Sequence, residues 1–355
     1  MKVPLMAISG KQTLNRQTKK QNVIIWGKGR DKLIVPSPKE HYYFVQGDGE
    51  LYSVLGKGNK IPLKRHTVEN ASELHPDRIG PNAKTDGVTS NELERICIEH
   101  PDFFKEYAAS EPSSLGFDLE VHSVDGNFPS GPKHPIVSIG VVTGAGDRVA
   151  FNWDGESDKG CILEFFNFIK EYDPDVFYGY NLIGYDFPQL FARCEVHGID
   201  AKPYLNRENN KSYGWEIDFS YHKRARIQAW GRIVIDVFNF VQRDHTLSGQ
   251  SKSLKNVSRV YGLNPIELDF AGKTILDYTP DEITEYVLSD CDATKFLYDH
   301  YFPQHKFIAE YLGVPLESYI NGPDNFITKI LQGRALYKQN ILTLDKNIDR
   351  PPDVS

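Results

Sequence analysis

Acidic side chains at three places along the chain have the type and spacing of ligands for divalent metal ions. They are Asp118 and Glu120, two residues apart, then Asp186, and finally Asp290, one helical turn after Tyr286. Carboxylate oxygens are the ligands that hard cations such as Mg²⁺ prefer. Two such ions held by carboxylates are a common means of hydrolysing a phosphodiester. If folding brings these segments together, we expect four carboxylates and one phenol to form one metal site.

Each acidic segment also has an ordinary explanation when it is taken alone. Asp118 and Glu120 can face water from an edge strand, because side chains two residues apart in a strand share one face. Asp186, close before Pro188, can be a helix cap. Asp290 can belong to the solvated face of an amphipathic helix. A metal site is favoured because all three segments occur together, each in the local context that its geometry requires: a strand, a loop before a helix, and a helix.

The elements that must position these acids form an alternation of strands and helices between residue 115 and about residue 300. In 115–121 the apolar side chains alternate with the two acids, which predicts a strand with one apolar face. The sequence 279–282 has a capping-box pattern with proline at the first helical position, so we expect a helix that carries Tyr286 and Asp290 on a common side. Further strands are expected at 136–142, 149–153, 176–180 and 232–240, and helices at 161–172, 188–197 and 253–261.

Strands in a mixed sheet with helices on its faces predict an α/β layer fold. The 355 residues exceed one small core, which favours two domains. We expect a smaller, β-rich α+β domain at 1–110, the domain with the acidic segments at 111–300, and a helical tail at 301–355. The net charge of −7 argues against a surface coated in basic residues for duplex binding, but a local basic groove stays possible.

Cysteine usage and hydropathy indicate a protein of the cytoplasm. The four cysteines are far apart and form no C-x-x-C pair, which predicts reduced thiols rather than a zinc site or a disulfide framework. No apolar run approaches the ~20 residues of a membrane helix. Residues 1–22 contain no apolar core of signal-peptide length. We therefore expect a cytoplasmic protein with no membrane partner.

In combination, these segments resemble the three exonuclease motifs of the family B DNA polymerases, and of tyrosine-type DEDD exonucleases more generally. The resemblance is strong from 115 to 300 and weak before and after. Many relatives have a hydroxyl residue at the position of Val121, but all four acids are present. The matching segments are Phe117–Glu120, Tyr178–Asn181, Tyr185–Pro188, Gly231–Phe238, Ser253–Val257 and Tyr286–Asp290.

The resemblance implies a ribonuclease H-like domain with two-metal-ion 3′–5′ exonuclease activity on single-stranded or frayed DNA 3′ ends, including those of primer–template DNA. Asp118, Glu120, Asp186 and Asp290 would then hold two Mg²⁺ or Mn²⁺ ions. The hydroxyl of Tyr286 would orient the attacking water. The product would be a 5′-mononucleotide.

The resemblance also implies a binding surface for single-stranded DNA. Asn181, Tyr185 and Leu119 match family positions that bind the strand, and stacking on an aromatic ring tolerates any base. Loop packing is the alternative for Asn181 and Tyr185. Other basic positions fit either phosphate contacts or a solvated surface: residues 222–226, Lys252 and Lys255.

The polymerase motifs of the family, including a Tyr-Gly-Asp-Thr-Asp palm sequence, do not occur in the sequence. We therefore expect no nucleotide polymerisation by this chain alone. It would be the proofreading part of a fragment or a split enzyme, whose palm and thumb could form a separate subunit. Two alternatives remain: a docking and DNA-binding subunit with weak or no nuclease activity, and a stand-alone nuclease of this type that acts on RNA.

Overall fold

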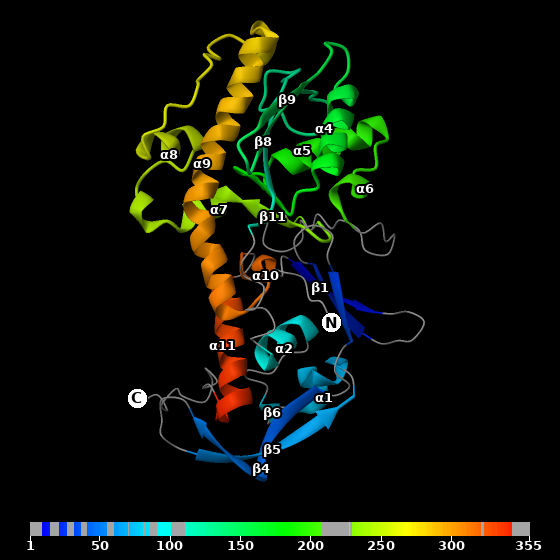
Figure 1. The fold of residues 1–355 in the computed structure, drawn as a ribbon, viewed down its shortest axis with the longest axis vertical. Helices are drawn as coiled ribbons and strands as arrows, with labels where there is room; N and C mark the ends of the chain where they lie inside the picture. Colours follow the sequence, from blue (N-terminus) through cyan, green and yellow to red (C-terminus); the bar gives the residue numbers. More distant parts are fainter. Residues whose placement is uncertain are drawn as a thin grey trace, which may run out of the picture. The chain divides into compact units, whose positions relative to one another are not determined.

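The computed structural model describes residues 9–14, 21–26, 32–36, 41–54, 60–69, 71–80, 83–84, 91–100, 111–207, 227, 229–320 and 323–342. The chain forms two compact units (Figure 1). Unit 1 contains Met1–Gly27, Asp31–Ala109 and Phe307–Ser355, and unit 2 contains Lys28–Arg30 and Ser110–Lys306.

Unit 1 contains two small sheets and several helices. One sheet has the antiparallel order β1-β2-β3, and in the other β4 lies between β12 and β5 and also pairs with β6. The strands are β1 (Ser9–Leu14), β2 (Gln21–Trp26), β3 (Lys32–Pro36), β4 (His41–Val54), β5 (Lys60–Val68), β6 (Ala83–Lys84) and β12 (Ile341–Leu342). The helices are η1 (Ala71–Leu74), α1 (Pro76–Ile79), α2 (Glu92–Glu99), α10 (Leu316–Ile320) and α11 (Pro323–Gln339).

From Phe307 on, the predicted helical tail belongs to unit 1. Leu336 of α11 is buried in a cluster with Tyr42 and Phe44 of β4. Arg334 donates a hydrogen bond to the carbonyl oxygen of Cys97 in α2, with an N–O distance of 2.7 Å. These contacts join residues more than 200 positions apart in the sequence, so local patterns do not reveal them. The domain types assigned to 1–110 and 111–300 stay predictions.

Unit 2 contains a five-stranded mixed sheet in the order β11-β10-β7-β8-β9. The strands β7, β8 and β9 pair antiparallel, and β7, β10 and β11 pair parallel. This sheet and its flanking helices confirm the predicted α/β class. The strands are β7 (Ser114–Val121), β8 (Ile136–Thr143), β9 (Arg148–Asn152), β10 (Val176–Gly179) and β11 (Ile233–Asp236). The helices are α4 (Lys159–Tyr172), α5 (Asp186–His197), α6 (Lys202–Leu205), α7 (Val237–Arg243), η2 (His245–Leu247), α8 (Leu254–Val260), η3 (Ile275–Asp277) and α9 (Pro280–Leu312), of which residues 280–306 belong to this unit.

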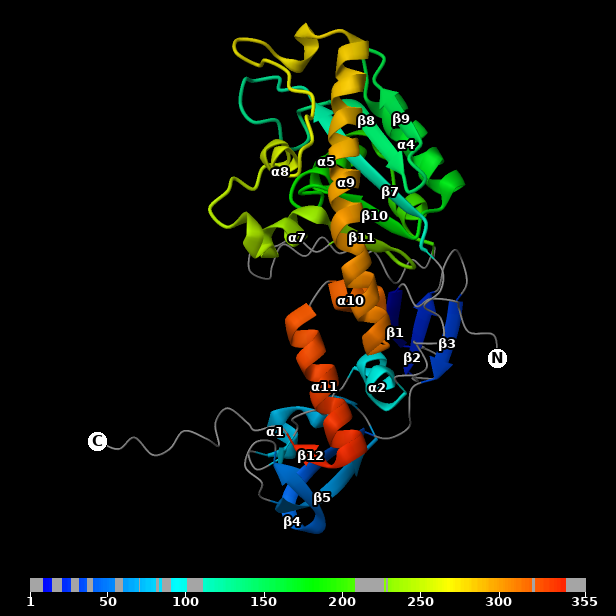
Figure 2. The same ribbon diagram turned by 60° about the vertical axis from the view of Figure 1, so that its left-hand side comes forward.

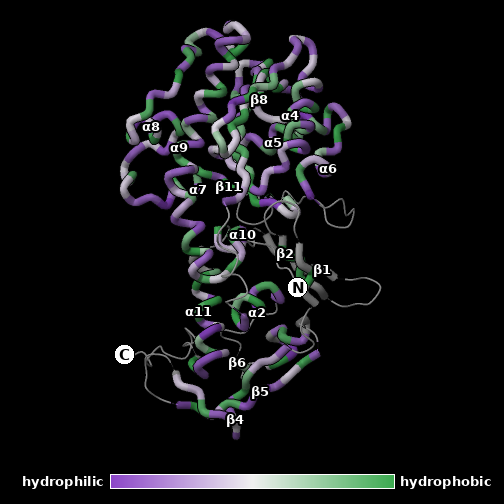
Figure 3. The backbone as a smooth tube through the Cα atoms, viewed as in Figure 1, coloured by the Kyte–Doolittle hydropathy of each residue, from purple (hydrophilic) through white to green (hydrophobic). Residues whose placement is uncertain are grey.

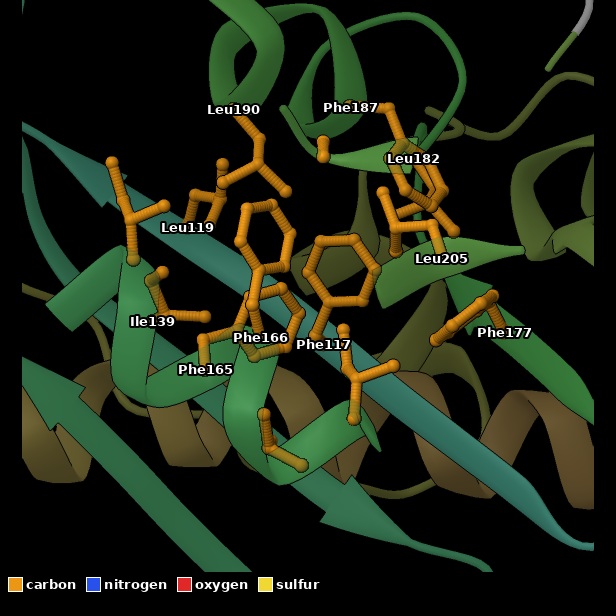
Figure 4. Packing of buried hydrophobic residues seen from close by; sticks show 14 of the residues in the cluster. Phe117, Leu119, Ile139, Phe165, Phe166, Phe177, Leu182, Phe187, Leu190 and Leu205 are labelled. Atoms are coloured by element: carbon orange, nitrogen blue, oxygen red, sulfur yellow. The ribbon is translucent and has the colours of Figure 1, made fainter. Parts of the chain in front are cut away.

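The apolar side of β7 packs against α4 and α5. Phe117 lies 5.1 Å, between ring centroids, from Phe165 of α4 and also from Phe187 of α5. Figure 4 shows these rings with Leu119 in one buried cluster. Since side chains alternate along a strand, Asp118 must lie on the opposite face of the sheet. The predicted alternation in 115–121 is therefore confirmed.

Helix α9 covers that opposite face, as Figures 1 and 2 show. The tight approach depends on Gly140 of β8, where a Cβ atom would lie 2.9 Å from a methyl group of Val287 and 3.0 Å from the Sγ atom of Cys291. Farther along, Tyr298 of α9 stacks on Tyr178 of β10 with 4.0 Å between ring centroids. The helix is thus held against the sheet on both sides of residue 290.

The strand predicted at 232–240 is wrong in its second half. The strand ends at Asp236, whose carboxylate accepts the backbone N–H of Phe238 at 3.1 Å and so begins α7. The aromatic and β-branched residues that follow belong to a helix because this cap fixes its first turn.

Hydrophilic and hydrophobic residues alternate along the helices of the described chain (Figure 3), and none of those helices is long and apolar enough to span a bilayer.

Candidate metal centre

Three of the four predicted metal ligands meet between β7 and α9. One carboxylate oxygen from each of Asp118, Glu120 and Asp290 lies within 4.8 Å of the other two. Asp118 and Glu120 are half-buried on the strand, and Asp290 is buried on the helix. We call these residues the three-carboxylate cluster. Its oxygens can converge on one hard cation.

Asp186 lies beside this cluster at the first turn of α5 and is 2% exposed. The pairing of β10 with β7 ends at Tyr178 and Gly116. Beyond that point, the backbone N–H of Leu119 donates to Oδ1 of Asp186 at 3.2 Å. This bond holds the carboxylate next to β7, although Asp186 is not among the three residues within 4.8 Å. Its role as a metal ligand stays a prediction.

The electrostatics of these acids favour a bound cation. Burial, followed by the charges of Asp186, Asp290 and Glu120, raises the pKa of Asp118 well above its usual range. Burial and the charge of Asp290 raise the pKa of Glu120 to about 8. Burial likewise raises the pKa values of Asp186 and Asp290. Acids that repel one another in a partly dry site are typical of a metal or catalytic centre, and an all-oxygen donor set fits Mg²⁺ or Mn²⁺.

Two other polar groups border the cluster. The ammonium group of Lys255 in α8 contacts the carboxylate of Asp290 and lies 4.4 Å from the ring centroid of Tyr286. The same ammonium donates to the carbonyl oxygen of Ile266 at 2.7 Å. Burial and the charge of Glu120 raise the pKa of Tyr286, so its hydroxyl keeps its proton near neutral pH. The structure thus places Lys255 at the acids rather than on a solvated surface.

The residues predicted to bind a single strand have different surroundings. Tyr185 is half-buried, and its hydroxyl donates to the carbonyl oxygen of Pro129 at 2.8 Å. Asn181 is exposed. The side chain of Leu119 is 5% exposed and lies in the apolar cluster, so only its backbone borders the acids. Their contacts with a substrate stay predictions.

The sequence reasoning missed Phe128, which is 74% exposed. Its ring centroid lies 5.3 Å from that of Tyr185. We call these two residues the aromatic pair, of which Phe128 is the exposed member. The sequence could have indicated this exposed ring, because residues 125–131 are otherwise polar or glycine-containing and a phenylalanine in such a loop has few apolar neighbours to pack against.

The basic positions proposed for phosphate contacts give a mixed result. The ammonium group of Lys252 donates to the carbonyl oxygen of Val241 at 2.8 Å, which favours a structural role. Residues 222–226 lie outside the described residues. Of the three positions, Lys255 alone is seen beside the acids.

Comparisons with known proteins agree on one family. A sequence model described as "DNA polymerase family B, exonuclease domain" matches residues 155–257. The chain is 25% identical over 334 residues to the catalytic subunit of DNA polymerase epsilon from Saccharomyces cerevisiae, covering 84% of this chain and 14% of the relative. It is 30% identical over 295 residues to the corresponding polymerase epsilon subunit of Emericella nidulans, covering 74% of this chain and 12% of the relative.

The fold is also similar to a solved structure, that of the family B DNA polymerase from Pyrobaculum calidifontis. The TM-score is 0.72 with 17% sequence identity, and the match covers 95% of this chain and 50% of the other. This likeness supports the fold. The chain therefore spans half or less of the proteins that it matches here.

Proposed function

We propose that this chain, which carries the exonuclease domain of the family B DNA polymerases, is a divalent-metal-dependent 3′–5′ exonuclease that removes nucleotides from single-stranded or frayed DNA ends. The three-carboxylate cluster is the observation that carries the proposal. It lies where β7 and α9 meet, with Asp186 and Tyr286 beside it. In the family context these are the groups that a proofreading nuclease needs.

The acids would hold the metal, and the other side chains would hold water and phosphate. Asp118, Glu120 and Asp290, completed by Asp186, would bind two Mg²⁺ or Mn²⁺ ions, which when bound lower the pKa of a water molecule and stabilise charge on the phosphate. Tyr286 keeps its proton and can therefore orient that water through a hydrogen bond. It is not suited to act as a general base, because its pKa is raised.

Substrate binding would use the aromatic pair. An unpaired base can stack on the exposed ring of Phe128 or on Tyr185, whereas a paired base is already stacked in its duplex. Stacking is independent of base identity, which suits an enzyme that must remove any terminal nucleotide. Lys255 adds a positive charge beside Asp290, where a phosphate of the strand would enter.

A direct test uses 5′-labelled single-stranded DNA and Mg²⁺ with three proteins. Wild type should shorten the strand stepwise from its 3′ end, and Asp118→Ala/Glu120→Ala should not. The matched control Glu164→Ala/Glu171→Ala removes two exposed acids from α4, so it should keep full activity. A matched RNA strand tests the RNA-acting alternative. DNA left intact by wild type would instead favour a docking or DNA-binding subunit.

A further inference from the structure

The turn that leads into α5 is held by a carboxylate from a neighbouring strand. Asp236, the last residue of β11, is 7% exposed. Its Oδ1 atom accepts the backbone N–H of Asn181 at 2.9 Å. Its Oδ2 atom accepts the backbone N–H of Ile183 at 3.1 Å. We call residues 181–186 the Asn181 turn.

The backbone of this turn needs such an anchor. Asn181 has φ of 60°, in the left-handed region that residues other than glycine seldom adopt, although asparagine does so more readily than most. Its carbonyl oxygen accepts the N–H groups of Gly184 and Tyr185, both at 2.9 Å. A Cβ atom at Gly184 would lie 2.3 Å from Oδ1 of Asn181. The turn therefore combines a left-handed residue with two internal hydrogen bonds, and the Asp236 carboxylate holds the backbone N–H groups of Asn181 and Ile183.

The Asn181 turn is tied to the sheet at two ends. At its start Asp236 binds two of its N–H groups, and at its end Asp186 accepts the N–H of Leu119 in β7. Tyr185 lies just before that second tie and bonds to Pro129. Residues 183–186 join the N–H group bound by Asp236 to the acid beside the three-carboxylate cluster. A displaced start of the turn would move Asp186 relative to Asp118.

We propose that Asp236 is a positioning residue for the exonuclease reaction, which fixes the Asn181 turn so that Asp186 and Tyr185 meet the metal and the strand. The inference rests on the proposed nuclease function. The hydrogen bonds of Asp236 to this turn go to its backbone, so the carboxylate acts through the path of the chain. An aspartate suits the task because each of its two oxygens accepts an N–H group, whereas an asparagine has one acceptor oxygen and an amide nitrogen that can only donate.

The positioning role of Asp236 is tested by comparing Asp236→Asn with Asp175→Asn, both in the full chain. Asp175 is fully buried just before β10, and its carboxylate accepts the N–H of Ser113 at 2.8 Å. Because β10 and β11 pair in parallel, Asp175 before the first residue of β10 and Asp236 at the last residue of β11 lie at opposite ends of these strands. Both variants replace a buried carboxylate that accepts a backbone N–H group, and Asp175 also pairs with the guanidinium of Arg207 at 2.8 Å, so the control disturbs the fold as well. Asp236 lies at the strand ends that lead to the acids, and Asp175 lies at the other ends.

We expect both variants to unfold at a lower temperature than wild type. The single-turnover cleavage rate should fall about 10- to 100-fold in Asp236→Asn only, as it does when other groups that orient metal ligands are replaced. Its half-saturating Mg²⁺ concentration should rise. Without metal or DNA, hydrogen exchange of the amides in 180–187 should accelerate in Asp236→Asn and not in Asp175→Asn. Equal losses of rate in the two variants, or unchanged exchange in 180–187, would overturn the inference.

A second variant keeps the test decisive if Asp236→Asn does not fold. Gly179→Ala perturbs the entry to the same turn, because a Cβ atom there would lie 3.0 Å from the backbone carbonyl oxygen of Phe117 and 2.8 Å from a methyl group of Leu182, and it leaves Asp236 in place. It should reproduce the loss of rate and the faster exchange. Faster exchange in 180–187 together with full activity in Gly179→Ala would contradict the inference. Wild type that leaves DNA intact would instead refute the proposed function itself, whatever these variants do.

Discussion

Replacing Glu120 by glutamine should stabilise the metal-free protein at high pH and at the same time abolish its nuclease activity. Burial and the charge of Asp290 raise the pKa of Glu120 from 4.5 to about 8 in the folded state. A raised pKa means that the folded protein binds a proton more tightly than the unfolded chain does. Stability from this group is therefore fully present below pH ~4.5 and is lost as pH rises through about 8. Glutamine does not ionise, so the variant lacks this loss.

The size of the effect follows from that pKa. Each pKa unit corresponds to ~1.4 kcal/mol, which sets an upper limit of about 5 kcal/mol on the gain in unfolding free energy at pH 9. The pKa of about 8 already includes the attraction of Lys255, but the half-buried carboxylate keeps some contact with water, which screens its charge. We therefore expect a gain of roughly 1–3 kcal/mol, or roughly 2–12 °C in Tm for a unit of this size.

The difference in Tm is measured by thermal unfolding in EDTA at pH 5 and pH 9. The same scans are then repeated with Mg²⁺. Glu120→Gln should match wild type at pH 5 and exceed it at pH 9. Mg²⁺ should raise the Tm of wild type at pH 9, since a ligand that binds the folded state stabilises it, and should raise that of the variant less. The exposed Glu171→Gln should follow wild type throughout. A variant less stable than wild type at pH 9, or a wild type insensitive to Mg²⁺, would refute the reasoning.

Three further changes test other parts of the site. Tyr286→Phe should slow cleavage by roughly 10- to 100-fold at saturating DNA and leave Tm nearly unchanged, because only the hydroxyl that orients water is lost; single-turnover kinetics measures this. Phe128→Ala should raise the KM for single-stranded DNA about 5- to 100-fold with little change in kcat, because a stacked base contributes ~1–3 kcal/mol; steady-state kinetics with strands of different terminal base checks it. Gly140→Val should lower both Tm and Mg²⁺ affinity, because its side chain would meet Val287 and Cys291 and displace α9; calorimetry measures both.

The residues of the three-carboxylate cluster could be predicted because local sequence patterns determine on which face of a strand or helix each side chain lies. Alternation along 115–121 places Asp118 and Glu120 on one face, and the structure shows the other face packed in the core. The capping box at 279–282 places a helix start correctly, so Asp290 falls one turn after Tyr286. These are short-range effects of backbone geometry.

What the sequence did not reveal depends on contacts between distant segments. Lys255 looked like a surface lysine because nothing near it in sequence shows that its helix faces Asp290, 35 residues later. Asp236 looked like part of a longer strand because its backbone partners, Asn181 and Ile183, lie more than 50 residues earlier. The burial of Leu336 could not be predicted because the other residues of its cluster lie in β4 and β5. In each case tertiary contacts decided the outcome.

At Gly140 the alternation of side chains along a strand and the contact between distant segments act together. Strand alternation can place Asp118 on the helix-covered face, but a carboxylate there binds metal only if the helix comes close enough to bring Asp290 within reach. Asp118 pairs across the ladder with Gly140, so the strand position nearest the acid is the one without a side chain. Val287 and Cys291 fill that space, and Asp290 lies on the same helix. The missing side chain at residue 140 thus lets β8 and α9 approach closely, so that acids of β7 and α9 come as near to one another as a shared cation would require.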